Sequence, residues 1–150
     1  MSWRFERGFT LLELIVVLGL VALGLAYVTP NFGRALEGAR FKAAVREVVS
    51  GLRQARGIAL SQGREAVFAL DVAAHTYQID GGDPQRLPQA IELGLHTAQS
   101  ELRSPTQGYI RFFPDGSATG GRIVLRLGGL AKRIDVNWLT GRVTVREHAG

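Results

Sequence analysis

The chain has no cysteine, and charged residues make up only 21% of its 150 residues. The absence of cysteine excludes disulfide bonds, thiolate metal ligands and cysteine nucleophiles. It leaves the cellular compartment open, because an exported domain of this size can fold without disulfide bonds. The formal net charge is +5, and so small a basic excess suits an anionic partner without identifying one.

Motifs of enzymatic chemistry are also absent. The three histidines are far apart in the sequence and none has the spacing of a metal-binding pair: His75, His96 and His148. In the glycine-rich stretch 116–120, the serine does not take the central position of a Gly-x-Ser-x-Gly nucleophile elbow. Asp80 and Asp83 are better explained as parts of a turn than as paired catalytic carboxylates. The sequence therefore predicts no catalytic residue, no metal site and no cofactor.

The sequence does contain one long apolar run. Phe9 to Val28 is a block of 20 residues whose only charged residue is Glu13, and thirteen of them are Phe, Leu, Ile or Val. At about 1.5 Å of rise per residue this block forms a helix of roughly 30 Å, the thickness of a bilayer's hydrocarbon core. The apolar residues contribute roughly −0.3 to −0.6 kcal/mol each, which outweighs a cost of about 3 kcal/mol for one carboxylate. We therefore expect residues 9–29 to form a transmembrane helix.

The residues before this run predict its orientation. Arg4 and Arg7 outnumber Glu6 in residues 1–8, so the N-terminus should stay in the cytoplasm while the C-terminal part is exported. No small-residue cleavage site of a secretory signal peptide follows the run. On these residues alone, a simple signal anchor remains an alternative.

Residues 30–63 predict an amphipathic continuation of the helix. Apolar residues recur at intervals of three and four and form one stripe: Phe41, Val45, Val48, Leu52, Ala55 and Ala59. The arginines of this stretch, Arg56 among them, should form a solvated face. Gly63 suits a left-handed helix stop. Gly19, Gly24 and Pro30 interrupt the helix and provide points at which it could bend.

Residues 64–150 predict a β-rich domain. Apolar and polar residues alternate with a period of two, which is typical of antiparallel sheets with one face on the core. The candidate strands are 65–70, 76–80, 90–95, 109–113, 122–127, 132–138 and 142–146. Residues 99–107 are the predicted mobile loop. The expected fold class is therefore α+β, a long N-terminal helix packed on antiparallel β-sheets.

The residues around the start of the apolar run carry a family resemblance. Residues 7–14, Arg-Gly-Phe-Thr-Leu-Leu-Glu-Leu, resemble the leader junction of type IV pilins and type II secretion pseudopilins. The resemblance implies a leader peptide of residues 1–8, cleavage between Gly8 and Phe9 by a prepilin peptidase, and N-methylation of Phe9. It also implies that Glu13 pairs with the N-terminal amine of a neighbouring subunit during assembly. Residue chemistry leaves a second partner open, the Phe9 amine of the same chain one helical turn away.

The C-terminal half carries a less specific resemblance. Residues 112–116, 119–121 and 138–142 resemble the C-terminal pattern of general secretion pathway protein H and related minor pilins. This implies a pilin-like fold and the role of a minor pseudopilin, a structural subunit of the periplasmic type II secretion pseudopilus that helps export folded proteins across the outer membrane. The implied partners are the prepilin peptidase, major and minor pseudopilins, the inner membrane and secreted cargo. The periplasmic domain would comprise residues 64–150.

Two alternatives remain. A type IV pilus minor pilin that binds DNA would explain the basic strands, where four arginines form a possible face for an anionic partner: Arg122, Arg126, Arg142 and Arg146. Lys132 and Arg133 are near in sequence, and a positive face with Trp138 available could hold a nucleic-acid backbone. A solubilising outer face of a sheet explains the arginines more simply, because the mature chain would carry a net charge of only about +4. The other alternative is a single-pass membrane protein that forms no filament.

Overall fold

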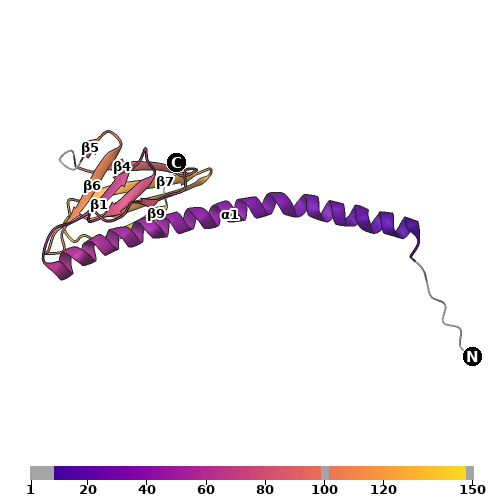
Figure 1. Ribbon diagram of the computed structural model, residues 1–150, viewed down its shortest axis with the longest axis horizontal. Helices are drawn as coiled ribbons and strands as arrows, with labels where there is room; N and C mark the ends of the chain where they lie inside the picture. Colours follow the sequence, from indigo (N-terminus) through magenta and orange to yellow (C-terminus); the bar gives the residue numbers. More distant parts are fainter. Residues whose placement is uncertain (1–8, 99–101, 148–150) are drawn as a thin grey trace, which may run out of the picture. The chain divides into compact units, whose positions relative to one another are not determined.

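The computed structural model describes residues 9–98 and 102–147, except for the side chains of residues 26–32, 34 and 102. The chain divides into two compact units, Met1–Gly38 and Ala39–Gly150. Helix α1, Leu11–Gln62, contributes to both of them (Figure 1). The predicted leader, residues 1–8, and His148 lie outside the described residues.

In the first unit, α1 is helical at Gly19, Gly24 and Pro30, so the prediction that these residues interrupt the helix is wrong. Each glycine costs only about 1 kcal/mol, and the good helix formers on either side propagate the helix cooperatively. No helix in the described part of the chain combines the length and apolarity needed to cross a bilayer. The predicted span includes residues 26–29, whose side chains are not described, and it stays a prediction.

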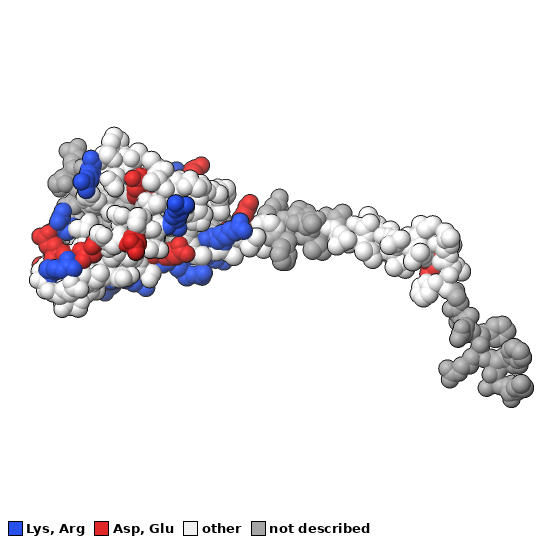
Figure 2. Space-filling model, viewed as in Figure 1, with Lys and Arg blue, Asp and Glu red and all other residues white. Residues whose placement is uncertain are grey.

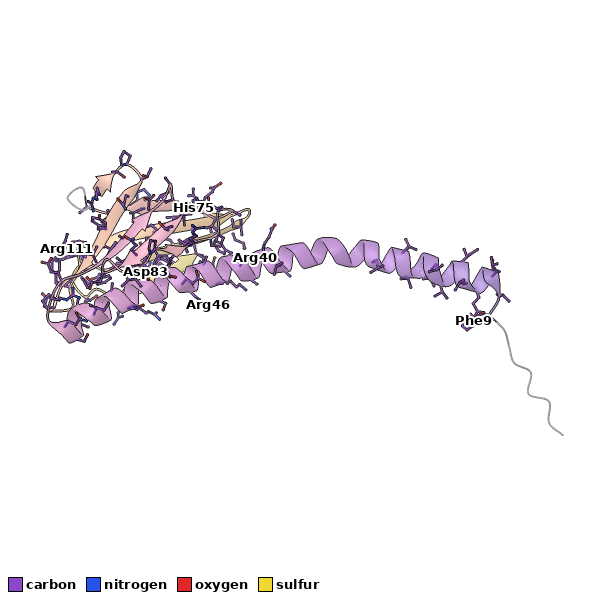
Figure 3. All side chains as sticks on the ribbon, in the orientation of Figure 1. Phe9, Arg40, Arg46, His75, Asp83 and Arg111 are labelled. Carbon is purple, nitrogen blue, oxygen red and sulfur yellow. The ribbon has the colours of Figure 1, made fainter. Side chains whose placement is uncertain are left out.

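In the second unit, the remainder of α1 buries the predicted apolar stripe. All six stripe residues are buried: Phe41, Val45, Val48, Leu52, Ala55 and Ala59. Arg46 is exposed and projects from the side of the helix opposite the sheets (Figure 3). The helix ends at Gln62, and Gly63 follows with a φ of 62°, which confirms the predicted left-handed stop.

Two antiparallel sheets follow the helix (Figure 1). The five-stranded sheet has the order β3-β2-β1-β6-β5, with β1 Ala66–Asp71, β2 Thr76–Ile79, β3 Gln85–Arg86, β5 Leu102–Ser104 and β6 Gln107–Phe112. The four-stranded sheet has the order β4-β7-β8-β9, with β4 Glu92–His96, β7 Gly121–Leu127, β8 Leu130–Val136 and β9 Val143–Glu147. All seven predicted strands are present, with ends that differ by up to two residues.

The structure also corrects the predicted loop at residues 99–107 over its described part, residues 102–107, while residues 99–101 lie outside the described residues. Within it, β5 pairs with β6 across a tight turn that contains Pro105, and the register shifts between Leu102 and Ser104. The Ser104 hydroxyl accepts hydrogen bonds from the backbone N–H groups of Thr106 and Gln107, which stabilises the turn. β3 was not predicted either. It is two exposed residues long and has no apolar alternation.

The core lies between the helix and the inner faces of the sheets. Alternate residues of β1 and β6 are buried, and Phe68 stacks on Tyr77 of β2 with ring centroids 5.4 Å apart. Gly51 of α1 allows close approach to this stack, since a Cβ at that position would lie 2.9 Å from the Phe68 ring. The amphipathic periodicities of helix and strands therefore converge on a single apolar interior.

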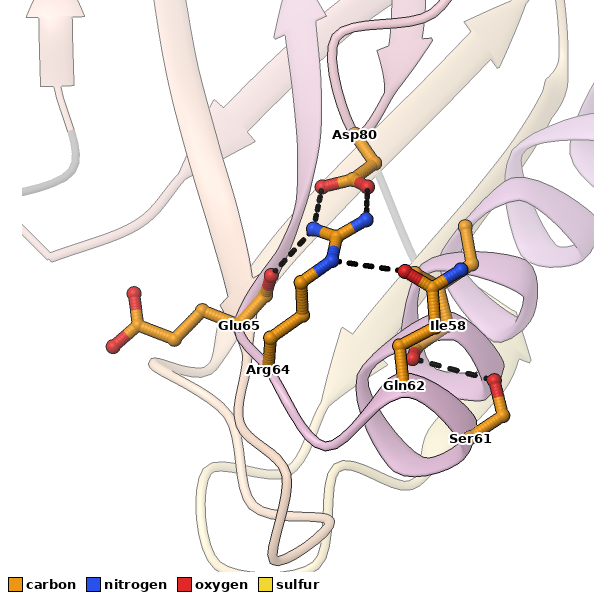
Figure 4. A network of polar contacts seen from close by, with 6 residues as sticks. All are labelled: Ile58, Ser61, Gln62, Arg64, Glu65 and Asp80. Atoms are coloured by element: carbon orange, nitrogen blue, oxygen red, sulfur yellow. Dashed lines mark hydrogen bonds and ion pairs between the residues drawn. The ribbon is translucent and has the colours of Figure 1, made fainter.

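A polar cluster holds the connection between α1 and β1 (Figure 4). The Arg64 guanidinium donates to both carboxylate oxygens of Asp80, to the side-chain oxygen of Gln62 and to the backbone carbonyl of Glu65. The hydrogen bonds and charge of Arg64 outweigh the effect of partial burial and hold the pKa of Asp80 below its ordinary value. This cluster ties the end of the helix to the end of β2.

Candidate assembly segment and basic sheet face

Helix α1 begins two residues after the predicted cleavage position. Thr10 caps it, because its hydroxyl accepts a hydrogen bond from the backbone N–H of Glu13 at 3.2 Å. The Thr10 carbonyl accepts the first helical hydrogen bond, from Leu14 at 3.1 Å. Phe9 stands just before the helix and is 79% exposed (Figure 3), while Gly8 lies outside the described residues. Sequence reasoning missed the cap, although Thr-x-x-Glu before an apolar run is its signature.

The first turns of α1 are apolar on every side. Every large hydrophobic side chain from Phe9 to Leu25 is exposed, and the least exposed, Val17, still exposes 45% of its surface. Glu13 is the only ionisable side chain in this stretch, visible as one red patch on a white surface (Figure 2). A helix that is apolar all round requires an apolar environment, either lipid or other helices.

The second candidate region is the outer face of the four-stranded sheet. In register, Arg122 of β7 lies opposite Asp135 of β8, and Arg133 of β8 lies opposite Arg146 of β9. Asp135 accepts hydrogen bonds from the Nε atoms of Arg122 at 2.8 Å and Arg133 at 2.9 Å. Burial tends to raise the pKa of Asp135, but the Arg122 hydrogen bond and the charges of Arg133 and Arg122 hold it below its ordinary value.

The structure brings together three of the four predicted arginines. Arg122, Arg142 and Arg146 line one open hollow of about 770 Å³ together with Arg133. Arg126 does not line it. Arg126 lies opposite Glu92 of β4 and borders a neighbouring hollow, which Arg122 lines as well. Arg142 precedes β9 rather than belonging to it. The four predicted residues therefore do not share one hollow, because Arg126 adjoins only Arg122, while Arg133 joins the other three.

The C-terminal strings that carry the family resemblance are parts of one arrangement of turns. Asn137 accepts hydrogen bonds through its side-chain oxygen from the N–H groups of Leu139 and Thr140, each at 3.0 Å. The Ala118 N–H, which lies between the first two strings, donates to the Trp138 carbonyl of the third at 2.8 Å. Gly120, with a φ of 76°, lies so close to Trp138 that a Cβ would be 3.1 Å from the Trp138 Cβ. These residues have a structural role that explains their pattern.

Arg56 attaches the helix to the same turns. Its Nη2 donates to the Thr140 carbonyl at 3.1 Å, and its Nε lies 3.5 Å from the Gly116 carbonyl oxygen that accepts from it. The prediction that Arg56 belongs to a solvated face is therefore wrong, because the two turns provide acceptors that helical periodicity cannot reveal.

Within residues 9–98 and 102–147 no three His, Asp or Glu side chains are grouped as metal ligands.

A long helix that begins with an exposed apolar segment and packs through its second half on two antiparallel sheets defines a pilin-like protein. The fold is shared with the type IV minor pilin FimU of Pseudomonas aeruginosa, with a TM-score of 0.51 and 16% identity, covering 70% of this chain and 91% of that one. It is also shared with the minor pseudopilin EpsH from the type 2 secretion system of Vibrio cholerae, with a TM-score of 0.53 and 13% identity, covering 70% and 94% of the respective chains.

Sequence comparisons identify the family. The model of the family "Type II transport protein GspH" matches residues 44–141, and that of the prokaryotic N-terminal methylation motif matches residues 3–29. Type II secretion system protein H of Xanthomonas campestris pv. campestris is 34% identical over 140 residues, which cover 93% of this chain and 83% of that protein. The chain belongs to the GspH family of type II transport proteins. Its role is that of a minor pseudopilin in type II secretion.

Proposed function

We propose that the chain is made as a prepilin, cleaved between Gly8 and Phe9 by a prepilin peptidase, and N-methylated on Phe9. The N-terminus lies in the cytoplasm before cleavage, residues 9–29 cross the inner membrane once, and the β-rich domain lies in the periplasm. The match of the methylation motif to residues 3–29 supports this order of events. The Thr10 cap supports it too, because it leaves Phe9 outside the hydrogen-bond ladder of the helix.

The observation that carries the proposal is a lone carboxylate on an otherwise apolar helical surface. Glu13 has no other ionisable side chain between Phe9 and Leu25 to pair with. A charged carboxylate in an apolar environment is expensive unless it has a partner, and the amine freed by cleavage is the only cation that this segment supplies. We assign that amine to a neighbouring subunit, so that the pair sets the axial register of the helices in the pseudopilus.

Replacing Glu13 tests this role. Glu13→Gln keeps the size of the side chain and removes its charge, so the protein should be cleaved and found in the membrane fraction but fail to restore secretion to a deletion strain. Glu37→Gln is the matched control, because Glu37 is an exposed glutamate of the same helix and the same unit. Secretion at the wild-type level with Glu13→Gln would contradict the assembly role.

The second candidate is a subunit of a type IV pilus that contacts DNA. The similarity to FimU concerns the fold alone, whereas the family match over residues 44–141 favours type II secretion. Deletion of the gene should therefore abolish the appearance of secreted proteins in the medium. Loss of twitching or transformation with normal secretion would favour the type IV system instead. Loss of none of these, with Gly8 left uncut, would favour a plain membrane anchor.

A further inference from the structure

The basic hollow on the four-stranded sheet continues around the edge of that sheet. Arg142 lines this hollow and also a neighbouring one beside helix α1. Together the two hollows are lined by six arginines, which we call the basic band: Arg53, Arg56, Arg122, Arg133, Arg142 and Arg146. Among the residues that the structure describes, Asp135 is the only acidic one that lines either hollow. The band therefore has a large local excess of positive charge.

The arrangement of the band is unfavourable for the isolated chain. Arg133 and Arg146 lie directly opposite each other on adjacent strands, and like charges at such a position are destabilising. Asp135 is already shared between Arg122 and Arg133. Among the described residues, no carboxylate lies within ion-pair distance of Arg142 or Arg146. A bound anionic group would relieve this repulsion.

Large apolar side chains stand beside these charges. Trp138 lines the hollow and exposes 65% of its surface, and its neighbour Leu139 exposes 63%. Arginine and tryptophan together are typical of the energetically dominant residues in protein–protein interfaces. Asp135 also lines the hollow, and its carboxylate repels an unbroken row of phosphates more than a segment in which carboxylates and apolar side chains are mixed. These features favour a polypeptide over a nucleic acid.

We propose that the basic band, with Trp138, is a docking surface for an acidic polypeptide segment that carries a large apolar side chain among its carboxylates. The inference rests on the proposed function for the source of that segment, since a sheet in the periplasm meets other pseudopilins and exported proteins. The carboxylates pair with Arg142 and Arg146, which are both exposed, and the apolar side chain packs on Trp138.

The test uses the full chain in detergent micelles with Trp3→Phe, which makes Trp138 the only tryptophan and its fluorescence the reporter. The probes are a glutamate peptide with one central leucine and a thymidine oligonucleotide of equal charge. Arg142→Gln with Arg146→Gln should weaken peptide binding about tenfold, which corresponds to about 1.4 kcal/mol lost from two exposed charge contacts. Arg40→Gln with Arg86→Gln removes the same charge from exposed sites outside the band and should change binding less than about twofold.

Replacing Arg142 and Arg146 by lysine keeps the charge and should restore most of the binding, which separates loss of charge from loss of folding. Three results would each overturn the inference: no peptide binding, an equal loss in the control variant, or tighter binding of the oligonucleotide than of the peptide. Failure of this test leaves cleavage at Gly8 and the role of Glu13 untouched. An uncleaved chain would contradict the proposed function and would leave peptide binding intact, so the two failures can be told apart.

Discussion

Two glycines of helix α1 make a sharp test of how the helix packs. Gly51 is buried, and a Cβ there would lie 2.9 Å from Phe68 Cε2 and 3.1 Å from Tyr77 Cε2. Phe68 is 1% exposed and stacked on Tyr77, so its ring cannot move aside. Gly57 is exposed on the same helix, and a Cβ there would have no neighbour within 4 Å. Substitution by alanine improves the helix propensity equally at both positions, but only at Gly51 does the added methyl group collide with the core.

The expected magnitudes follow from these contacts. Gly→Ala in a helix interior gains about 1 kcal/mol, and overpacking a dense core costs roughly 1–3 kcal/mol. Gly57→Ala should therefore stabilise the chain by about 1 kcal/mol, and Gly51→Ala should destabilise it by about 1 kcal/mol. For a domain of this size the two variants should differ in Tm by roughly 8 °C. Thermal unfolding followed by circular dichroism measures the difference, and equal Tm values would refute the close packing of α1 on β1 and β2.

Two further predictions concern the turns and the outer sheet face. Gly141→Ala should lower the free energy of unfolding in urea by more than about 2 kcal/mol, because the φ of Gly141 is 60° and a Cβ would lie 2.4 Å from the Gly116 carbonyl oxygen. The control is Gly63→Ala. Gly63 has a similar φ but open space around it, so this change should cost only about 1 kcal/mol. The pKa of the Asp135 carboxyl is lower in the folded chain than in the unfolded chain, where it is about 3.9. The ionised carboxylate therefore stabilises the fold fully at pH values above about 3.9, and this stabilisation is lost as the pH falls from there through the lower folded pKa. Asp135→Asn should flatten the acid limb of the stability curve, and an unchanged limb would contradict the ion pairs.

Much of the fold could be predicted because burial imposes a period on the sequence. The stripe from Phe41 to Ala59 follows from one apolar face, and the structure buries it. In β7 the predicted inward residues Ile123 and Leu125 are buried, but Val124 on the other face is buried as well. β3 and β5 could not be predicted, since two or three residues on sheet edges carry no such period. Pro30 misled the prediction because a single lost hydrogen bond does not outweigh a long cooperative helix.

The candidate site was only partly predictable for a different reason. Arg122, Arg142 and Arg146 were identified from strand alternation, but their grouping with Arg133 depends on the order β7-β8-β9, which no local pattern encodes. The same holds for Arg56, whose acceptors are more than fifty residues away in sequence. The Thr10 cap was different, because its signal was present in the sequence and was missed.

The central claim is that the apolar helix stays attached to the exported domain and becomes a polymerisation device after cleavage before Phe9. Intact-mass and N-terminal analysis of the protein, isolated from cells with and without prepilin peptidase, tests it most directly. We expect a chain that begins at N-methylated Phe9 when the peptidase is present and at Met1 when it is absent. A mass independent of the peptidase, or a periplasmic chain that begins beyond Val28, would contradict the claim.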